Sequence, residues 1–123
     1  MTLLFSKDDI KKRVSEIGQA VSNEFKGKDP IFIGVLNGSF MFMADLLRSL
    51  NIDCEIDFIK IRSYVGKSSS GTIQLIKDIS ADVTNRNVIL VEDIIDSGHT
   101  IHFLRDRLTG ASPKSISIIT FLI

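Results

Sequence analysis

The feature that most constrains this fold is a pair of short, unbroken apolar runs, Ile31–Leu36 and Val88–Val91. Apolar runs of this length without polar alternation are typical of strands covered on both faces, as in a parallel sheet. Ile116–Ile123 is a third, largely apolar segment of the same kind. Parallel strands need long crossover connections, which are usually helices. The runs therefore predict a sheet whose strands alternate with helices.

The segments between the runs have helical periodicity. Apolar residues spaced three or four apart form one stripe along Asp8–Lys26, which predicts an amphipathic helix. Phe40–Leu50 also reads as a helix, but it is apolar around most of its circumference, which indicates core packing on more than one side or a subunit contact. Ile101–Leu108 marks a third helix, and Gly110 is expected to end it.

A hairpin is expected between the second and third helices. Apolar and polar residues alternate over Ile52–Ile61, which predicts a strand with one solvent-exposed face. Cys54 belongs to the apolar set, so we expect a buried structural thiol. The strand pattern resumes at Thr72–Lys77, and the Ser/Gly-rich stretch of about 63–72 is expected to be a mobile loop, either a surface excursion or a lid.

These elements predict an α/β fold with an open, mostly parallel twisted sheet and flanking helices. The 123 residues suit a single domain, 1–123. Lys and Arg number 15 and Asp and Glu also 15, so no overall charge attracts nucleic acid. The single cysteine and the absence of a secretory signal pattern indicate the cytoplasm, and no apolar stretch approaches the ~20 residues of a membrane span.

The segment richest in chemistry follows the run Val88–Val91. Glu92 and Asp93 place two carboxylates at the C-terminal end of a strand, and Asp96–Thr100 form a small-residue turn before a helix. Ligands of open α/β sheets bind beyond the C-terminal ends of the strands. The N–H groups and hydroxyls of the turn suit a phosphate, while the two carboxylates suit sugar hydroxyls or Mg²⁺.

Two other interpretations of this segment remain open on the residue pattern alone. Aspartate is common as a helix N-cap, so Asp96 could have only that structural role. Acidic pairs at strand ends also occur in receiver-type signalling domains, where they bind Mg²⁺ beside a phosphorylated aspartate. In receivers, however, the pair normally ends the first strand, whereas Glu92 and Asp93 end a late one.

Several motifs in order resemble the purine phosphoribosyltransferases, type I enzymes with a Rossmann-like sheet. Val91–Thr100 resembles their phosphoribosyl pyrophosphate signature, and Gly34–Leu46 resembles the pyrophosphate loop of the hypoxanthine branch. Ser63-Tyr64 with Ser70-Gly71 is similar to the mobile catalytic loop of that branch, and Pro113–Ser115 to the approach to its next strand. The resemblance covers essentially the whole chain.

The resemblance implies transfer of a phosphoribosyl group from phosphoribosyl pyrophosphate to hypoxanthine or guanine in purine salvage, with release of pyrophosphate. Asp96 would be the general acid/base facing the purine N7. Glu92 and Asp93 would contact the ribose hydroxyls and help position Mg²⁺, the implied cofactor. The 5′-phosphate would be held by main-chain and hydroxyl groups of Asp96, Ser97, Gly98, His99 and Thr100.

The remaining implied contacts concern pyrophosphate and closure of the site. Backbone amides would be presented to pyrophosphate by Leu36, Asn37 and Gly38, often through a cis peptide in the family. Ser63 and Tyr64 would close over the reacting centre. Exclusion of water would protect the oxocarbenium-like charge that develops on the ribose as the leaving group departs.

The sequence departs from the family pattern at two places. Asn37 stands where many relatives carry a basic residue. The sequence ends at Ile123, whereas in the family the last strand continues into a lysine that recognises the purine 6-oxo group, an aromatic residue that stacks on the base and an aspartate that binds a second Mg²⁺.

Two alternatives to an active enzyme follow: a regulatory phosphoribosyl pyrophosphate-binding relative, and a fragment that binds this ligand but is inert towards purines. For any of these we expect no nucleic-acid or membrane partner. The apolar helix Phe40–Leu50 and the habit of the family favour a dimer or tetramer.

Overall fold

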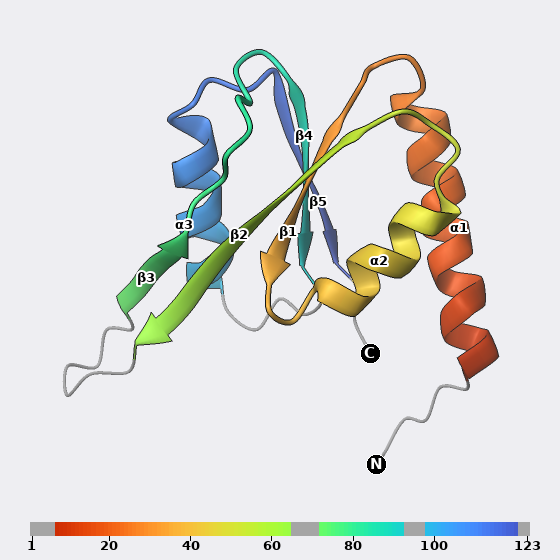
Figure 1. The fold of residues 1–123 in the computed structure, drawn as a ribbon, viewed down its shortest axis with the longest axis horizontal. Helices are drawn as coiled ribbons and strands as arrows, with labels where there is room; N and C mark the ends of the chain where they lie inside the picture. Colours follow the sequence, from red (N-terminus) through yellow and green to blue (C-terminus); the bar gives the residue numbers. More distant parts are fainter. Residues whose placement is uncertain (1–6, 65–71, 93–97, 121–123) are drawn as a thin grey trace.

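The structure is a computed structural model that describes residues 7–64, 72–92 and 98–120. Its elements in chain order are α1 (Lys7–Phe25), β1 (Ile31–Leu36), α2 (Phe40–Ser49), β2 (Glu55–Tyr64), β3 (Thr72–Lys77), β4 (Asn87–Glu92), α3 (Gly98–Thr109) and β5 (Ser115–Thr120). The strands form a five-stranded sheet in the order β3-β2-β1-β4-β5 (Figure 1). Every neighbouring pair is parallel except the hairpin β2–β3. The predicted α/β class is therefore confirmed.

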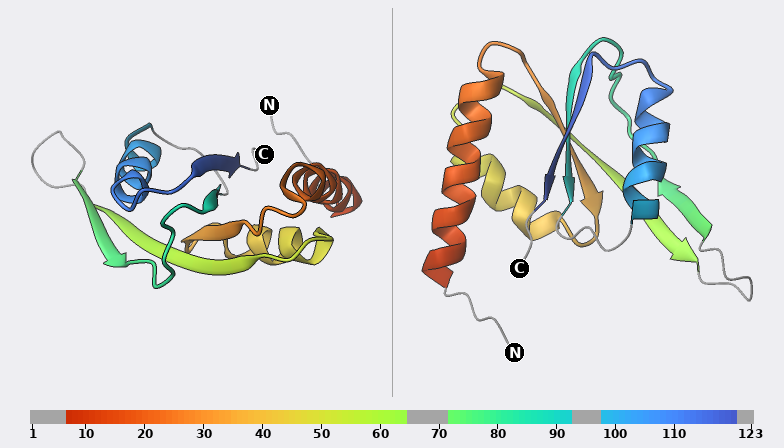
Figure 2. Two further views of the ribbon diagram at one scale, coloured as in Figure 1. Left: turned by 90° about the horizontal axis from the view of Figure 1, so that it is seen from above. Right: turned by 180° about the vertical axis from the view of Figure 1, so that it is seen from behind.

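The helices cover both faces of this sheet. One buried cluster joins α1 and α2 to Phe32 of β1 and Ile89 of β4. A second joins α3 to Ile33 of β1 and Leu90 of β4. Figure 2 shows α3 on the side of the sheet opposite α2. Adjacent residues of the central strands thus point into different clusters, which is why these strands contain no polar alternation.

The hairpin differs from its predicted bounds. β2 begins at Glu55 and continues to Tyr64, whereas the alternation suggested Ile52–Ile61. Its ladder with β3 pairs Ser63 with Ile73 and Tyr64 with Thr72, so these residues belong to strands rather than to the connecting loop. Residues 65–71, which contain the rest of the expected mobile loop, lie outside the described residues.

The alternation over β2 and the segment before it also predicted the wrong burial for two side chains. Cys54 is half-buried rather than buried. Ile56, expected in the covered set, is 46% exposed. Ile56 is not part of the cluster formed with α1 and α2, although Ile52 and Cys54 before it and Phe58 after it pack against that cluster. The alternation therefore identified a face but not how much of that face is covered.

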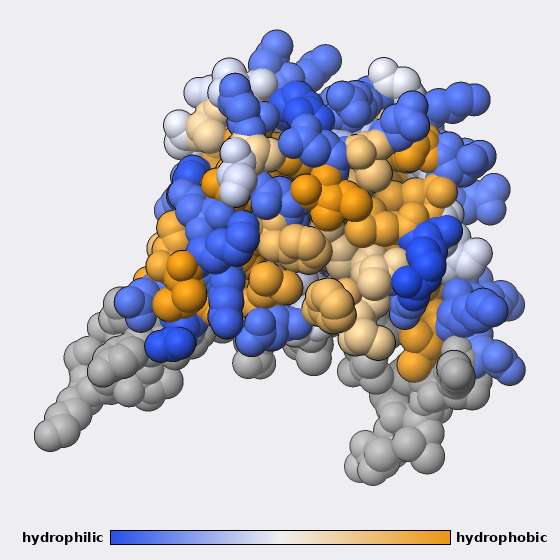
Figure 3. Space-filling view, in the orientation of Figure 1, coloured by the Kyte–Doolittle hydropathy of each residue, from blue (hydrophilic) through white to orange (hydrophobic). Residues whose placement is uncertain are grey.

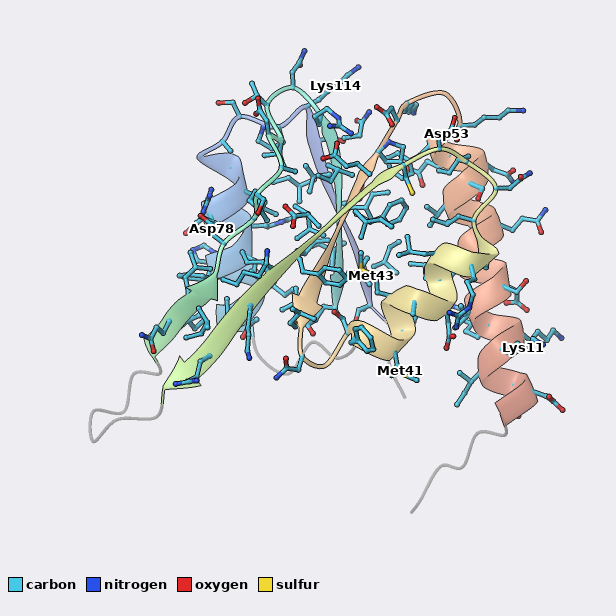
Figure 4. The ribbon with its side chains drawn as sticks, viewed as in Figure 1. Lys11, Met41, Met43, Asp53, Asp78 and Lys114 are labelled. Atoms are coloured by element: carbon cyan, nitrogen blue, oxygen red, sulfur yellow. The ribbon has the colours of Figure 1, made fainter. Side chains whose placement is uncertain are left out.

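Helix α2 packs mainly through one side. Its buried residues are Phe42, Met43 and Leu46, whereas Phe40 is 55% and Met41 69% exposed. Figure 4 shows Met43 directed towards the sheet and Met41 away from it. In Figure 3, apolar side chains gather on the face formed by α2 and β2. Core packing therefore explains only part of the apolar character of this helix. Among the described residues, no helix is long and apolar enough to cross a membrane.

Candidate active site

The C-terminal edge of the sheet collects the described residues of the predicted site. β1, β2, β4 and β5 run in the same direction and end at this edge, the lower one in Figure 1. The turn after β1, Glu92 at the end of β4 and the N-terminus of α3 all lie there. This is the edge at which open α/β sheets bind ligands. The separate sequence motifs at 36–38, 92 and 98–100 thus belong to one region.

A buried hydrogen bond from the side chain of Ser39 stabilises the turn between β1 and α2. The peptide bond between Leu36 and Asn37 is cis. Ser39 is fully buried, and its Oγ donates a hydrogen bond of 2.5 Å to the carbonyl oxygen of Val35. Asn37 and Gly38 are exposed above it. Within the described residues, the Gly38 N–H has no hydrogen-bond acceptor. The turn therefore exposes Asn37 and Gly38 to the site, while the hydrogen bond of Ser39 to Val35 fixes its position.

The N-terminus of α2 adds partial positive charge to this turn. Ser39 occupies the N-cap position but makes no side-chain hydrogen bond to the helix, and the first turn contains no acidic residue. The helix dipole, together with N–H groups at a helix N-terminus, favours an anionic ligand. The turn and the helix that follows it are thus suited to hold part of a phosphate-bearing ligand.

β4 and α3 contribute the other half of the site. Glu92 is buried, at 7% exposure, and it is paired in register with Thr120 at the end of β5. Helix α3 begins at Gly98, so Gly98–Thr100 form its first turn rather than a turn preceding it. That first turn contains no acidic residue. A buried carboxylate and a second helix N-terminus therefore occupy the same edge of the sheet.

Other predicted site residues are described only partly or not at all. Asp93, Asp96 and Ser97 lie outside the described residues, as does the side chain of His99. The structure places the backbone of Ser63 and Tyr64 at the end of β2 but does not describe their side chains. For these residues the sequence-based roles stay predictions.

The described donors are compatible with Mg²⁺ but do not form a complete protein cage. No group of three or more His, Cys, Asp or Glu side chains comes together among the described residues. Mg²⁺ is commonly held by one or two carboxylates together with substrate phosphates and water. The Glu92 carboxylate is a hard oxygen donor of this kind, so it fits a shared site of that type.

One residue with a structural role, Asp57 of β2, was not identified from the sequence. Its Oδ1 accepts a hydrogen bond of 2.7 Å from the N–H of Phe58, and its Oδ2 accepts bonds of 2.6 and 2.8 Å from the N–H groups of Ser80 and Ala81. The Lys77 ammonium lies 3.6 Å from Oδ1. Asp57 therefore fastens the connection that follows the hairpin to the middle of β2.

A second ion pair ties the same connection to α3. Asp78 accepts hydrogen bonds of 3.2 and 2.6 Å from the Nε and an Nη of Arg107. The guanidinium of Arg107, assisted by the N–H of Ile79, lowers the pKa of the Asp78 carboxyl despite partial burial. The connection that follows the hairpin is thereby attached both to β2, through Asp57, and to α3, whose N-terminus forms part of the site.

This arrangement defines the type I phosphoribosyltransferase fold. Residues 4–122 match the phosphoribosyl transferase domain family, and the chain belongs to that family, in its hypoxanthine-guanine branch. All the motifs on which the sequence-based resemblance rested lie within the matched region.

This chain covers only part of the length of its sequence relatives. It is 39% identical over 119 residues to a hypoxanthine-guanine phosphoribosyltransferase of Streptococcus pyogenes, with 96% of this chain and 66% of that enzyme covered. It is also 39% identical over 121 residues to a bifunctional TilS/HprT protein of Listeria monocytogenes, with 98% of this chain and 19% of that protein covered. The chain therefore spans less than two thirds of these relatives.

Solved structures share the fold closely. A hypoxanthine-guanine phosphoribosyltransferase of Bacillus anthracis is 42% identical, with a TM-score of 0.86 and coverage of 98% of this chain and 70% of that one. A hypoxanthine phosphoribosyltransferase of Trypanosoma cruzi, in complex with the product IMP, is 32% identical, with a TM-score of 0.86 and coverage of 96% of this chain and 68% of that one.

Proposed function

We propose that this chain is the phosphoribosyl pyrophosphate-binding core of an enzyme that transfers the phosphoribosyl group to a 6-oxopurine, hypoxanthine or guanine. The observation that carries the proposal is the meeting of the β1–α2 turn, Glu92 and the N-terminus of α3 at one edge of the sheet. Two helix N-termini give two separate places for phosphate groups. Relatives named for hypoxanthine and guanine, one solved with IMP, support the choice of base.

In the proposed complex, the 5′-phosphate is held by Asp96–Thr100 at the N-terminus of α3. The exposed backbone of Leu36–Gly38 binds pyrophosphate at the N-terminus of α2. Glu92 and Asp93 hold the ribose hydroxyls between these two anions. Ser63 and Tyr64, at the end of β2, complete the contacts on the remaining side.

The chemistry proposed for these residues is stabilisation of a positively charged ribose. When the bond between the anomeric carbon and pyrophosphate breaks, positive charge develops on the ring, and nearby carboxylates stabilise it. Asp96 accepts the proton that leaves the purine as its N–C bond to the ribose forms. Mg²⁺, when bound, neutralises charge on the departing pyrophosphate. Asp96 is therefore the general base of the proposal.

The proposal includes a cytoplasmic setting and a homo-oligomer, a dimer or tetramer. The single cysteine of the sequence suits a reducing compartment. The exposed side chains of Phe40 and Met41, on the outer side of α2, supply apolar surface for contact between copies.

A titration separates the enzyme from its alternatives. The chain is titrated calorimetrically with Mg²⁺ and phosphoribosyl pyrophosphate, and IMP formation is then measured after addition of hypoxanthine. We expect binding in both wild type and Asp96→Asn, with turnover in the variant reduced about a hundredfold or more, the range of general acid–base catalysis. Asp82→Asn, at an exposed aspartate in the β3–β4 connection, controls for loss of one negative charge.

The outcomes distinguish the candidates. Failure of wild type to bind phosphoribosyl pyrophosphate would refute the proposal. Binding without IMP formation would favour the second candidate, a ligand-binding fragment or regulatory relative, which the coverage of only 66% of the streptococcal enzyme makes worth testing. Unchanged turnover in Asp96→Asn would show that another group accepts the proton.

A further inference from the structure

The proposed pyrophosphate site contains no positively charged side chain in its own turn. Leu36, Asn37, Gly38 and Ser39 are all neutral, although pyrophosphate carries several negative charges. The helix N-terminus and free N–H groups contribute only partial charges. A full positive charge from this chain must therefore come from a neighbouring element.

The β1–β2 ladder places one such charge directly beside the turn. Lys60 of β2 is the register partner of Leu36, the last residue of β1. Neighbouring strands lie about 4.8 Å apart, and the four-carbon stem of lysine is longer than that distance. The Lys60 ammonium therefore has the reach to contact a ligand bound at Asn37 and Gly38.

The face of β2 that carries Lys60 is the face on which α2 begins. Phe58, two residues before Lys60, packs against the cluster formed by α1 and α2. A Cβ built on Gly34, the register partner of Phe58, would lie 3.0 Å from its ring, which confirms that this face adjoins β1 closely. Because side chains alternate along a strand, Lys60 shares the face of Phe58. It therefore lies on the side of the sheet where the turn leads into α2.

Lys60 also differs from the other lysine in this part of the sheet. It is half-buried, yet it has no ion pair or hydrogen bond among the described residues. Its opposite neighbour on β3, Lys77, donates to the carbonyl oxygen of Phe58 at 2.8 Å and pairs with Asp57. A partly desolvated cation without a partner is unfavourable, and an anionic ligand would relieve that cost.

We propose that Lys60 binds the pyrophosphate group and supplies the positive charge that the β1–α2 turn lacks. This inference rests on the proposed function, because it assigns a residue to the same ligand. Lys60 acts on the pyrophosphate alone. The 5′-phosphate at the N-terminus of α3 is held by a different element.

The test compares two ligands that differ in the pyrophosphate. Affinities for phosphoribosyl pyrophosphate with Mg²⁺ and for ribose 5-phosphate are measured by calorimetry in wild type, Lys60→Ala, Lys60→Arg and Lys114→Ala. Lys114 is an exposed lysine at the opposite edge of the sheet, labelled in Figure 4, so it controls for loss of one positive charge. Lys60→Ala combined with Asn37→Lys tests whether a charge placed in the turn substitutes for Lys60.

We expect Lys60→Ala to weaken phosphoribosyl pyrophosphate binding about tenfold and to leave ribose 5-phosphate binding unchanged, as for loss of one charge-assisted contact. Lys60→Arg keeps the charge and should stay within about threefold of wild type, because a single positive charge still faces the anion. The Asn37→Lys substitution should restore most of the affinity lost in Lys60→Ala. The loss should shrink as salt is raised.

Equal affinity of wild type and Lys60→Ala for phosphoribosyl pyrophosphate would overturn the inference while leaving the proposed function intact. An equal loss for both ligands would overturn it too, because it would indicate a general disturbance of the site. If wild type binds neither ligand, the proposed function fails first and the inference fails with it.

Discussion

Replacement of Asp57 by asparagine should destabilise this domain measurably, although the residue lies in the middle of a strand and resembles an ordinary surface aspartate in sequence. The side chain is only 12% exposed. Its carboxylate accepts three backbone N–H bonds, from Phe58, Ser80 and Ala81. Asparagine has nearly the same shape, so the change removes the charge and one acceptor without creating a cavity.

The expected magnitude follows from these bonds. A hydrogen bond to a charged group contributes about 1.5–3 kcal/mol. Asparagine keeps one acceptor oxygen but directs an NH₂ group at a donor on the other side. The exposed Ser80 segment can recover hydrogen bonds from water. We therefore expect a loss of about 2 kcal/mol in the free energy of unfolding rather than the full sum.

Urea denaturation is the assay, because such a loss lowers the midpoint without changing the slope. Asp53→Asn is the matched control: Asp53 is exposed and has no hydrogen bond within the described part of the chain, so its replacement should change stability by less than about 0.5 kcal/mol. A loss no larger in Asp57→Asn than in Asp53→Asn would refute the reasoning.

The effect of Asp57 should also depend on pH. Burial raises the pKa of its carboxyl, but the N–H groups of Ala81, Phe58 and Ser80 and the Lys77 ammonium outweigh burial and leave the pKa below its ordinary value. Because the folded-state pKa is the lower one, the contribution is complete above the unfolded value of about 3.9 and is lost as pH falls through the folded value. Wild type and Asp57→Asn should therefore converge in stability in acid. A difference that stays constant from about pH 7 to pH 3 would contradict this assignment.

Two further predictions concern packing and thiol chemistry. Gly34→Ala should lower the free energy of unfolding by about 1–3 kcal/mol, measured by urea denaturation, because a Cβ there would lie 2.5 Å from the Met43 sulfur and 3.0 Å from the Phe58 ring. Gly110→Ala is the control and should be nearly neutral, because a Cβ at that position would lie 3.6 Å from its neighbours. Burial, with the nearby negative charges of Asp29 and Asp53, raises the pKa of the Cys54 thiol. Iodoacetamide should therefore alkylate Cys54 more slowly than free glutathione at about pH 8, and a faster reaction would refute this.

The central strands were predictable because their environment is nearly symmetrical. Phe32 points into the cluster of α1 and α2, and its neighbour Ile33 points into the cluster of α3. Both faces of the central strands therefore carry apolar side chains, and these appear in the sequence as an unbroken apolar run. Ile31–Leu36 was bounded to the residue for this reason.

The hairpin was less predictable because its environment is asymmetrical. Ser63 and Tyr64 are strand residues only because β3 supplies partners for them, a pairing that is not encoded in their own neighbourhood. Composition around them favours a loop. Ile56 shows the converse, since its apolar character suggests burial but the helical layer leaves it partly uncovered. Tertiary context decided both cases.

The candidate site was predicted from local motifs, and its supporting contacts were not. The turn at Leu36–Gly38 and the start of α3 each have a compact signature, and parallel topology brings them to one edge. Asp57 has no such signature, because its partners Ser80 and Ala81 lie 23 and 24 residues further along the chain. Only the folded hairpin brings those N–H groups to the carboxylate.

The two faces of β2 suggest how a chain with zero net charge would bind the highly charged ligand that we propose. Asp57 and Lys60 are three residues apart and therefore lie on opposite faces of the strand. The Asp57 carboxylate accepts hydrogen bonds from three backbone N–H groups, and its charge therefore stabilises the fold. The charge of Lys60 meets no partner among the described residues, on the face where the neutral turn Leu36–Gly38 leads into α2. The proposed anion binding would thus depend on which charges the fold leaves uncompensated, and not on the sum over the sequence.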